Sequence, residues 1–306
     1  MIRLPERAAY AALLTIIWLH AGAQTAAAPQ LPAQPAPQSA ALSGIAHVAI
    51  RVGDLERSRA FYRTLGYEEA FAMDAGGSPT EAFFKINDRQ FIEIYPRREP
   101  GQAIGFMHVC FEAPDLNALH QEYEAQGLTP TPVKKAGAGN LLFTLQGPEE
   151  PGLPAGLRPQ ATQNIEYTQY MPGSRHTLDR GKHLGTNRIA EEMAGVAISV
   201  SDSAAAAAFY LTKLSFQRMA HPLEPGIPAL ALPNATNNFI ELVPPHERAA
   251  NDPPQVLPLR VLFAVPDLKA ASRRLRALGL PAGIHQNTID IEDPDGNHLI
   301  FIRRGR

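Results

Sequence analysis

The sequence has a single cysteine, Cys110, so an intrachain disulfide and a cysteine-rich zinc site are both excluded. It also lacks an excess of one charge, because 28 lysines and arginines stand against 30 aspartates and glutamates. That balance argues against a surface that binds nucleic acid. The apolar run near the N-terminus, residues 8–19, is well short of the ~20 residues that a membrane-spanning helix needs.

The length and the apolar content predict a folded protein with more than one domain. A chain of 306 residues is long enough for two domains of ~150 residues each. Apolar residues make up 45% of it, which excludes disorder of the whole chain. The 28 prolines, about 9% of the residues against a typical ~5%, gather in clusters that mark boundaries between folded segments.

The N-terminus has the pattern of an export signal. Arg3 and Arg7 precede the short apolar run, and small residues follow at positions 21–23. This predicts a signal peptide over residues 1–23, cleaved after Ala23, and a periplasmic or secreted protein without stable membrane insertion. An uncleaved anchor is the alternative. Residues 24–42 are rich in proline, alanine and glutamine, which predicts a tether without a packed core.

Internal repeats predict the architecture of the rest. Residues 47–54 match residues 195–202, and residues 108–116 match residues 260–268. The chain is therefore a duplication, in which residues 43–171 recur as residues 192–306. Each half divides again into two units of the order strand, helix, strands. We expect each half to fold as a domain with its own core. Residues 172–191 join the halves as a linker or, alternatively, reach over a cleft of the first half.

Several features of these units together resemble the vicinal oxygen chelate superfamily. They are a histidine that begins a strand, an Asp-Leu followed by Phe-Tyr in a helix, a closing Ile-Glu strand, and Asp-Pro-Asp-Gly-Asn at residues 293–297. The superfamily includes glyoxalase I, bleomycin-resistance proteins and extradiol dioxygenases. The resemblance implies an α+β fold with four βαβββ modules, paired into two glyoxalase-like domains at residues 43–171 and 192–306.

The resemblance also implies a metal site, because the family places ligands on the first and last strands of each module. In the first half these positions are occupied by His47, Glu93, His108 and Glu166. Two imidazoles and two carboxylates suit one divalent ion, such as Ni, Co, Zn, Fe or Mn. The equivalent residues of the second half are Gly195, Glu241, Arg260 and Ile300. Since glycine, arginine and isoleucine side chains do not coordinate metals, we expect the second domain to bind none.

Strand alternation predicts which residues share the pocket with the metal ligands. The candidates for substrate binding are Arg51, Tyr95, Thr168 and Tyr170. Arg51 would hold an anionic group of the substrate or, alternatively, lie at the rim of the pocket. The segment 148–163 has no counterpart in the second half. It is either a lid or binding loop, or a solvated excursion without a role.

These features predict an exported metalloprotein that acts on a small molecule. The first hypothesis is a glyoxalase I-like lyase or isomerase, in which the metal chelates adjacent substrate oxygens and Glu93 or Glu166 transfers a proton. The second is an extradiol dioxygenase, with iron held by two histidines and one glutamate. The third is a non-catalytic binding or resistance protein. The substrate, the metal and the oligomeric state are left open by the sequence.

Overall fold

The computed structural model describes residues 41–148, 163–219, 226–233, 237–244 and 260–304. The predicted signal peptide, the tether up to residue 40 and positions 149–162 of the predicted loop lie outside these residues. No helix among the described segments is long and apolar enough to cross a membrane.

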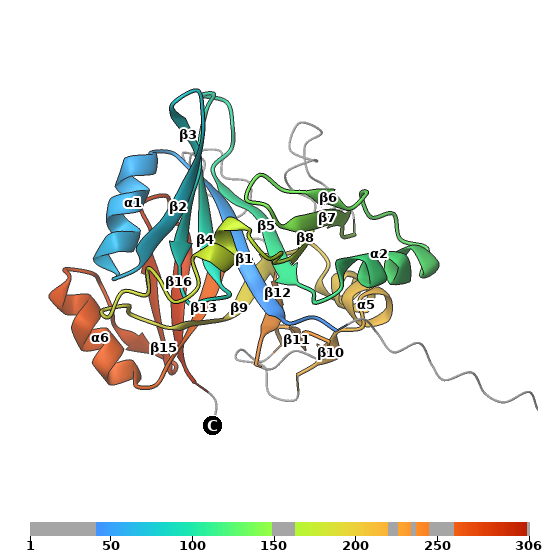
Figure 1. Ribbon diagram of the computed structural model, residues 1–306. Helices are drawn as coiled ribbons and strands as arrows, with labels where there is room; N and C mark the ends of the chain where they lie inside the picture. The colour runs from blue at the N-terminus through green and yellow to red at the C-terminus, as the bar shows by residue number, and fades with distance from the viewer. Residues whose placement is uncertain (1–40, 149–162, 220–225, 234–236, 245–259, 305–306) are drawn as a thin grey trace, which may run out of the picture. The chain divides into compact units, whose positions relative to one another are not determined.

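Four modules of the order βαβββ follow one another along the chain (Figure 1). The first consists of β1 (Gly44–Val52), α1 (Leu55–Thr64), β2 (Glu68–Ala75), β3 (Ser78–Lys85) and β4 (Phe91–Pro96). The second consists of β5 (Gly105–Glu112), α2 (Leu116–Ala125), β6 (Lys134–Lys135), β7 (Leu141–Gln146) and β8 (Asn164–Gln169). The third consists of β9 (Glu192–Ser199), α5 (Ser203–Lys213), β10 (Gln217–Arg218), β11 (Ala229–Ala231) and β12 (Phe239–Val243). The fourth consists of β13 (Arg260–Val265), α6 (Leu268–Ala277), β14 (Ile284–His285), β15 (Thr288–Glu292) and β16 (His298–Arg303).

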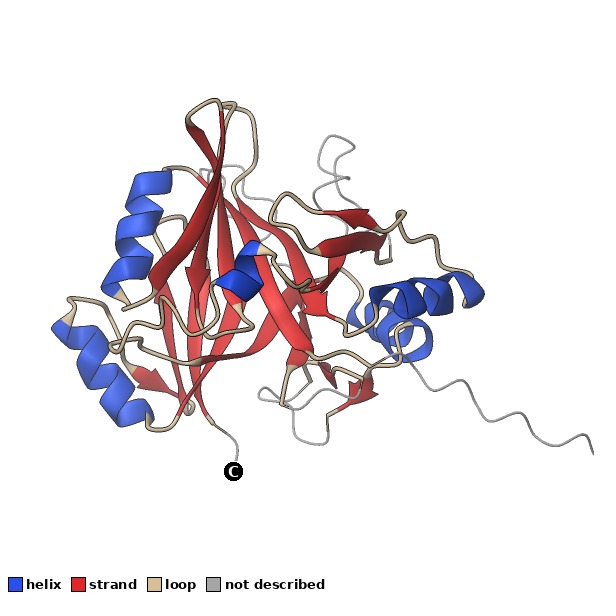
Figure 2. Ribbon diagram, viewed as in Figure 1, coloured by secondary structure: helices blue, strands red, loops and turns tan. Residues whose placement is uncertain are grey.

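The modules pair within each half to form two eight-stranded sheets (Figure 2). The first sheet has the order β2-β3-β4-β1-β5-β8-β7-β6, and the second has the order β10-β11-β12-β9-β13-β16-β15-β14. In each sheet the first strands of the two modules are adjacent and antiparallel, and each lies parallel to the last strand of its own module. The predicted α+β fold with two paired-module, glyoxalase-like domains is thereby confirmed.

The four long helices of the described segments begin in the same way. An aspartate caps each of them, and its carboxylate accepts a hydrogen bond from a backbone N–H of the first turn. Such a cap satisfies backbone donors that have no partner within the helix. The capping residues are Asp54, Asp115, Asp202 and Asp267. The start of each module's helix is thus fixed by a local signal that the repeats carry in the sequence.

The buried core differs from the prediction of a separate core for each half. One continuous cluster of buried apolar residues includes side chains from both sheets. Tyr67 stacks on Phe263 with ring centroids 6.0 Å apart, and Phe111 contacts Phe216 at 5.6 Å. The joint core follows from the amphipathic helices and strands, because one apolar face of each sheet is buried against elements of the other half.

Candidate metal centre

The four central strands of the first sheet position the predicted metal ligands. His47 is on β1 and His108 is on β5, and these strands are adjacent. Glu166 lies on β8 opposite Cys110 of β5, and Glu93 lies on β4 opposite Ala49 of β1. The pairing of β1 with β5 is irregular at two places, between Ile45 and His47 and between Ala49 and Ile50. Such bulges redirect side chains and occur often beside functional sites.

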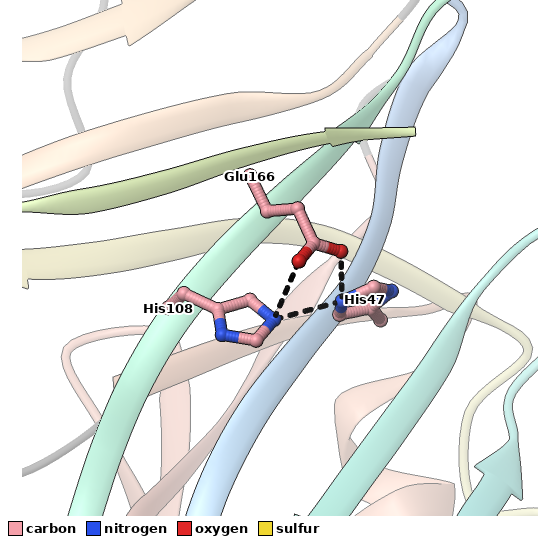
Figure 3. Close-up of side chains that lie close together, drawn as sticks. All are labelled: His47, His108 and Glu166. Atoms are coloured by element: carbon pink, nitrogen blue, oxygen red, sulfur yellow. Dashed lines mark hydrogen bonds and ion pairs between the residues drawn. The ribbon is translucent and has the colours of Figure 1, made fainter. Parts of the chain in front are cut away.

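Three of these side chains converge on a common point (Figure 3). Nε2 of His47 lies 3.0 Å from Nε2 of His108 and 3.4 Å from Oε1 of Glu166. The distance from Nε2 of His108 to Oε2 of Glu166 is 3.9 Å. Each residue offers one ligand atom, and these atoms all lie within 4.8 Å of one another. Side chains from three strands therefore form one compact donor group.

This donor group fits a divalent metal ion. Ligand atoms at ~2.1 Å from one ion lie ~3.0 Å apart at right angles and ~3.4 Å apart in a tetrahedron. The observed separations of His47 from its two neighbours match these values. Two imidazoles and one carboxylate are also a donor set that divalent transition metals prefer. The cluster of His47, His108 and Glu166 can hold one such ion.

Glu93, the fourth predicted ligand, does not join the converging group of His47, His108 and Glu166. Its Oε1 lies 3.1 Å from Nδ1 of His47, the ring nitrogen that faces away from the cluster. Its Oε2 accepts a hydrogen bond from the hydroxyl of Tyr95 at 3.0 Å. A carboxylate next to the second nitrogen of a ligating histidine orients the ring and increases its basicity. The sequence did not reveal this arrangement, because it gave the strand of Glu93 but not the nitrogen that it faces.

The two glutamates have opposite electrostatic environments. Burial, reinforced by Glu166 and Glu81, raises the pKa of Glu93 to about 7. Burial would raise the pKa of Glu166 as well, but His108 and His47 outweigh it and lower that pKa to about 2. Burial also lowers the pKa of His108 to about 4, which keeps this imidazole neutral and able to ligate.

A cavity of about 290 Å³ adjoins the cluster. Of the predicted substrate-binding residues, Tyr95 and Thr168 line it, together with His47, Glu93 and Glu166. The lysines of β6 and Glu81 complete its charged lining. The cavity thus brings together both catalytic candidates and two of the four substrate-binding candidates.

The other two substrate-binding candidates make contacts within the protein. Arg51 donates from Nη1 to the backbone carbonyl of Ala103 at 3.0 Å. Tyr170 donates its hydroxyl to the backbone carbonyl of Arg89 at 3.0 Å. Neither residue is in the cavity lining. The sole cysteine, Cys110, is buried in an apolar cluster with Phe83.

The segment that joins the halves contributes to the cavity. It contains the short helix α4 (Arg175–Leu178), and His176 of this helix lines the same cavity. Of the two roles expected for residues 172–191, this contact corresponds to the second, in which the segment reaches over a cleft of the first half. Burial lowers the pKa of His176 to about 3, so the imidazole is neutral. No spacing signal in the sequence connects this histidine with the strands of the metal cluster.

The second half has the same strand register without the ligands. Ile300 of β16 lies opposite Leu262 of β13, as Glu166 lies opposite Cys110 in the first half. Glu241 and Arg260 both lie opposite Ala197 of β9. Apolar side chains, among them Phe239, form a buried cluster on this face of the second sheet. Among the described residues, no three ligand-type side chains converge in this half.

Comparison with known proteins gives the same family. Residues 44–152 match the family model of the Glyoxalase/Bleomycin resistance protein/Dioxygenase superfamily. No curated protein sequence matches the chain. The resemblance seen in the repeats is therefore confirmed for residues 44–152, which match the model of this superfamily.

Solved structures with the same fold include two kinds of enzyme. The Mn(II)-bound glyoxalase from Novosphingobium aromaticivorans is 17% identical, with a TM-score of 0.61 over 86% of this chain and 82% of that chain. A 2,3-dioxygenase from Pseudomonas sp. KL28 is 18% identical, with a TM-score of 0.60 over 87% of this chain and 94% of that chain. An extradiol ring-cleaving dioxygenase from B. fuscum is 13% identical, with a TM-score of 0.59 over 89% and 74% of the two chains. At these identities the likeness concerns the fold alone.

Proposed function

We propose that the first half of the chain is a metal-dependent enzyme domain that binds a small molecule through two adjacent oxygen atoms. The observation that carries this proposal is the convergence of His47, His108 and Glu166 beside a cavity of about 290 Å³. The cavity is close to the ~300 Å³ at the lower end of small-molecule sites. The proposed ion is divalent, chosen from Ni, Co, Zn, Fe and Mn. The similar glyoxalase contains Mn(II), so manganese is the first ion to test.

The first proposed reaction is that of a glyoxalase I-like lyase or isomerase. A divalent ion bound here would act as a Lewis acid that polarises the oxygens of the substrate. Glu93 lies in the cavity wall but outside the three-residue cluster. Its carboxylate, held by the Tyr95 hydroxyl, is in position to take a proton from a substrate and return it. Glu166 and the two histidines would hold the ion.

A second proposed reaction is ring cleavage by an extradiol-type dioxygenase. The specific observation in its favour is the composition of the cluster, since two histidines and one carboxylate form the ligand set of many non-haem iron oxygenases. In this case Glu93 would orient His47 through its Nδ1. Two of the structures compared above are dioxygenases by name.

Metal analysis combined with two assays separates these reactions. The purified protein is loaded with iron and mixed with catechol, and oxygen consumption is followed with an electrode. Manganese- and nickel-loaded protein is mixed with the thiol adduct of a 2-oxoaldehyde, and isomerisation is followed without oxygen. Turnover in one assay alone assigns the reaction. Metal binding without turnover in either assay would favour a binding protein, and failure to bind any of the metals would refute the proposal.

Replacing Glu93 tests its position relative to the ion. We expect Glu93→Gln to weaken Mn²⁺ affinity by about 10- to 100-fold, the usual effect of losing a carboxylate that orients a ligating histidine. Glu166→Gln should have a larger effect, because Glu166 belongs to the converging group. The affinities are measured by calorimetric titration of the metal-free protein. Equal losses of Mn²⁺ affinity in the two variants would show that Glu93 coordinates the ion directly, as Glu166 is proposed to do.

We also propose that the mature chain begins near Gln24 and acts outside the cytoplasm. The support is the short apolar run and the small residues before Gln24. Expression in a Gram-negative host, followed by fractionation and mass spectrometry of the intact protein, measures both points. We expect a periplasmic protein that lacks residues 1–23. A soluble cytoplasmic protein that retains Met1 would show that this segment is not a signal peptide.

A further inference from the structure

The strand β6 brings two lysines to the cavity beside the metal centre. Lys134 and Lys135 form this short strand, and both belong to the cavity lining. Both lysines are exposed, whereas His47 and Glu93 of the same lining are buried. The cavity therefore has a buried part, next to the metal ligands, and a solvated mouth that carries positive charge.

The strand register places Lys134 on the same face of the sheet as the metal ligand Glu166. Lys134 lies opposite Leu142 of β7, and Leu142 lies opposite Thr168 of β8, two residues beyond Glu166. Residues directly opposite one another on neighbouring strands share a face, and so do residues two apart along one strand. Leu142 and Thr168 also line the cavity. Lys134 thus projects from the face that forms the cavity wall, and Lys135 projects from the opposite face.

The ammonium group of Lys134 is available to a ligand. It has no ion pair or hydrogen bond with any residue that the structure describes. Two carboxylates of the cavity lining have other neighbours. Glu93 contacts Nδ1 of His47 and the hydroxyl of Tyr95, and Glu166 contacts the imidazoles of the metal cluster. The lysine is therefore not used to neutralise either of these glutamates.

A bound divalent ion would leave the cavity with an excess of positive charge. The ion and the two lysines would carry four positive charges, against at most three negative charges from Glu81, Glu93 and Glu166. The histidines of the lining do not change this balance, because a ligating imidazole is neutral and burial lowers the pKa of His176 to about 3. The charge balance of the metal-loaded cavity thus favours an anionic ligand over a neutral one.

We propose that Lys134 binds a carboxylate group of the substrate at the mouth of the cavity, while the metal holds two adjacent oxygens at the buried end. This inference rests on the proposed function for the metal end of the site. A role in binding an anionic group was expected of Arg51, but Arg51 donates to the carbonyl of Ala103 instead. An exposed ammonium group suits a carboxylate, because both groups stay partly hydrated and the cost of desolvation is small.

Pairs of ligands that differ only in this charge test the proposal. Mn²⁺-loaded protein is titrated in the absence of oxygen with catechol, with 3,4-dihydroxybenzoate, 3,4-dihydroxyphenylacetate and 3-(3,4-dihydroxyphenyl)propanoate, and with the primary amides of these three acids. Each amide has the size of its acid and no charge, and the series varies the distance between the carboxylate and the chelating oxygens. We expect at least one acid to bind about 5-fold or more tightly than its amide, which is the upper end of the effect of an exposed ion pair.

Variants separate the contribution of Lys134 from that of the metal. Lys134→Gln removes the charge, and we expect it to reduce the preference for the acid by about 3-fold or more. Lys134→Glu should reduce this preference further, because it places a negative charge at the same position. Lys135→Gln should have a smaller effect than Lys134→Gln, since Lys135 projects from the other face. Lys269→Gln, on α6 and outside this cavity, should retain the full preference.

The outcomes distinguish this inference from the proposed function. If catechol does not bind to the Mn²⁺-loaded wild-type protein, the proposed function fails. If catechol binds but no acid is preferred to its amide, the carboxylate site is refuted while the proposed function stands. An unchanged preference in Lys134→Gln, or a larger loss in Lys135→Gln, would refute the role of Lys134. Circular dichroism and Mn²⁺ content establish that each variant is folded and loaded with metal.

Discussion

The double variant His47→Ala with Glu166→Ala is expected to bind no measurable Mn²⁺. These residues supply two of the three converging ligand atoms, from the central strand β1 and from β8. Since the loss of a group behind a ligand already costs ~10- to 100-fold in affinity, the loss of two ligands should cost well over ~100-fold. Calorimetric titration and metal analysis after dialysis measure the effect.

Glu241→Ala is the matched control for that experiment. Glu241 is buried on β12 of the second sheet, at the position that Glu93 has in the first. Because no converging ligand set surrounds it among the described residues, its replacement should leave the metal content unchanged. Full metal retention in the double variant would show that the ion is held elsewhere, and a loss in Glu241→Ala would place part of the site in the second half.

Lys85→Met is expected to destabilise the protein by about 3–5 kcal/mol, the usual result of removing one partner of a buried ion pair. The Lys85 side chain has no exposed surface, and only 6% of the Asp179 side chain is exposed. The variant leaves Oδ2 of Asp179 and two carbonyl groups without the Lys85 donor, while Oδ1 of Asp179 keeps its contact with His183. Urea unfolding followed by circular dichroism measures the change in the free energy of unfolding.

Two further variants identify the cause of that loss. Lys85→Met combined with Asp179→Leu should recover part of the stability, because the buried carboxylate is removed together with its lysine and the other partner of Lys85, Asp88, is exposed to solvent. Lys269→Met, on the surface helix α6, should change the free energy of unfolding by less than ~0.5 kcal/mol. If Lys85→Met alone has as small an effect as Lys269→Met, the joining segment is not held by this ion pair.

The repeats allowed much of the fold to be predicted from the sequence. Matching segments such as residues 47–54 and 195–202 revealed the duplication, and the capping residues Asp54 and Asp115 lie within the matching segments 47–54 and 108–116. The βαβββ order implied a strand after the first helix, but the residues of β2 were not located, because its sequence is rich in glutamate and alanine and lacks a run of branched residues. Local patterns were thus sufficient wherever the structure depends on neighbours in the chain.

The parts that were missed depend on contacts between distant residues. The family resemblance implied His47, Glu93, His108 and Glu166 as ligands. It did not show that Glu93 faces Nδ1 of His47 rather than the shared position of the other three. The buried bond between Lys85 and Asp179 joins residues 94 positions apart, and no periodic pattern marks either of them. The joint core was missed for a related reason, because an apolar stripe shows that a face is buried but not what covers it.

Phe239 obstructs the return of a ligand at Gly195, the position that corresponds to His47. A side chain added at Gly195, the counterpart of His47, would place its Cβ 2.8 Å from Cε2 of Phe239. A histidine introduced at Gly195 would therefore require the ring of Phe239 to move, whereas Phe91, the counterpart of Phe239 in the first sheet, leaves room for His47. After the duplication one copy is free to specialise in chemistry while the other becomes its permanent support. That support contributes Phe263 and Phe216 to the shared core.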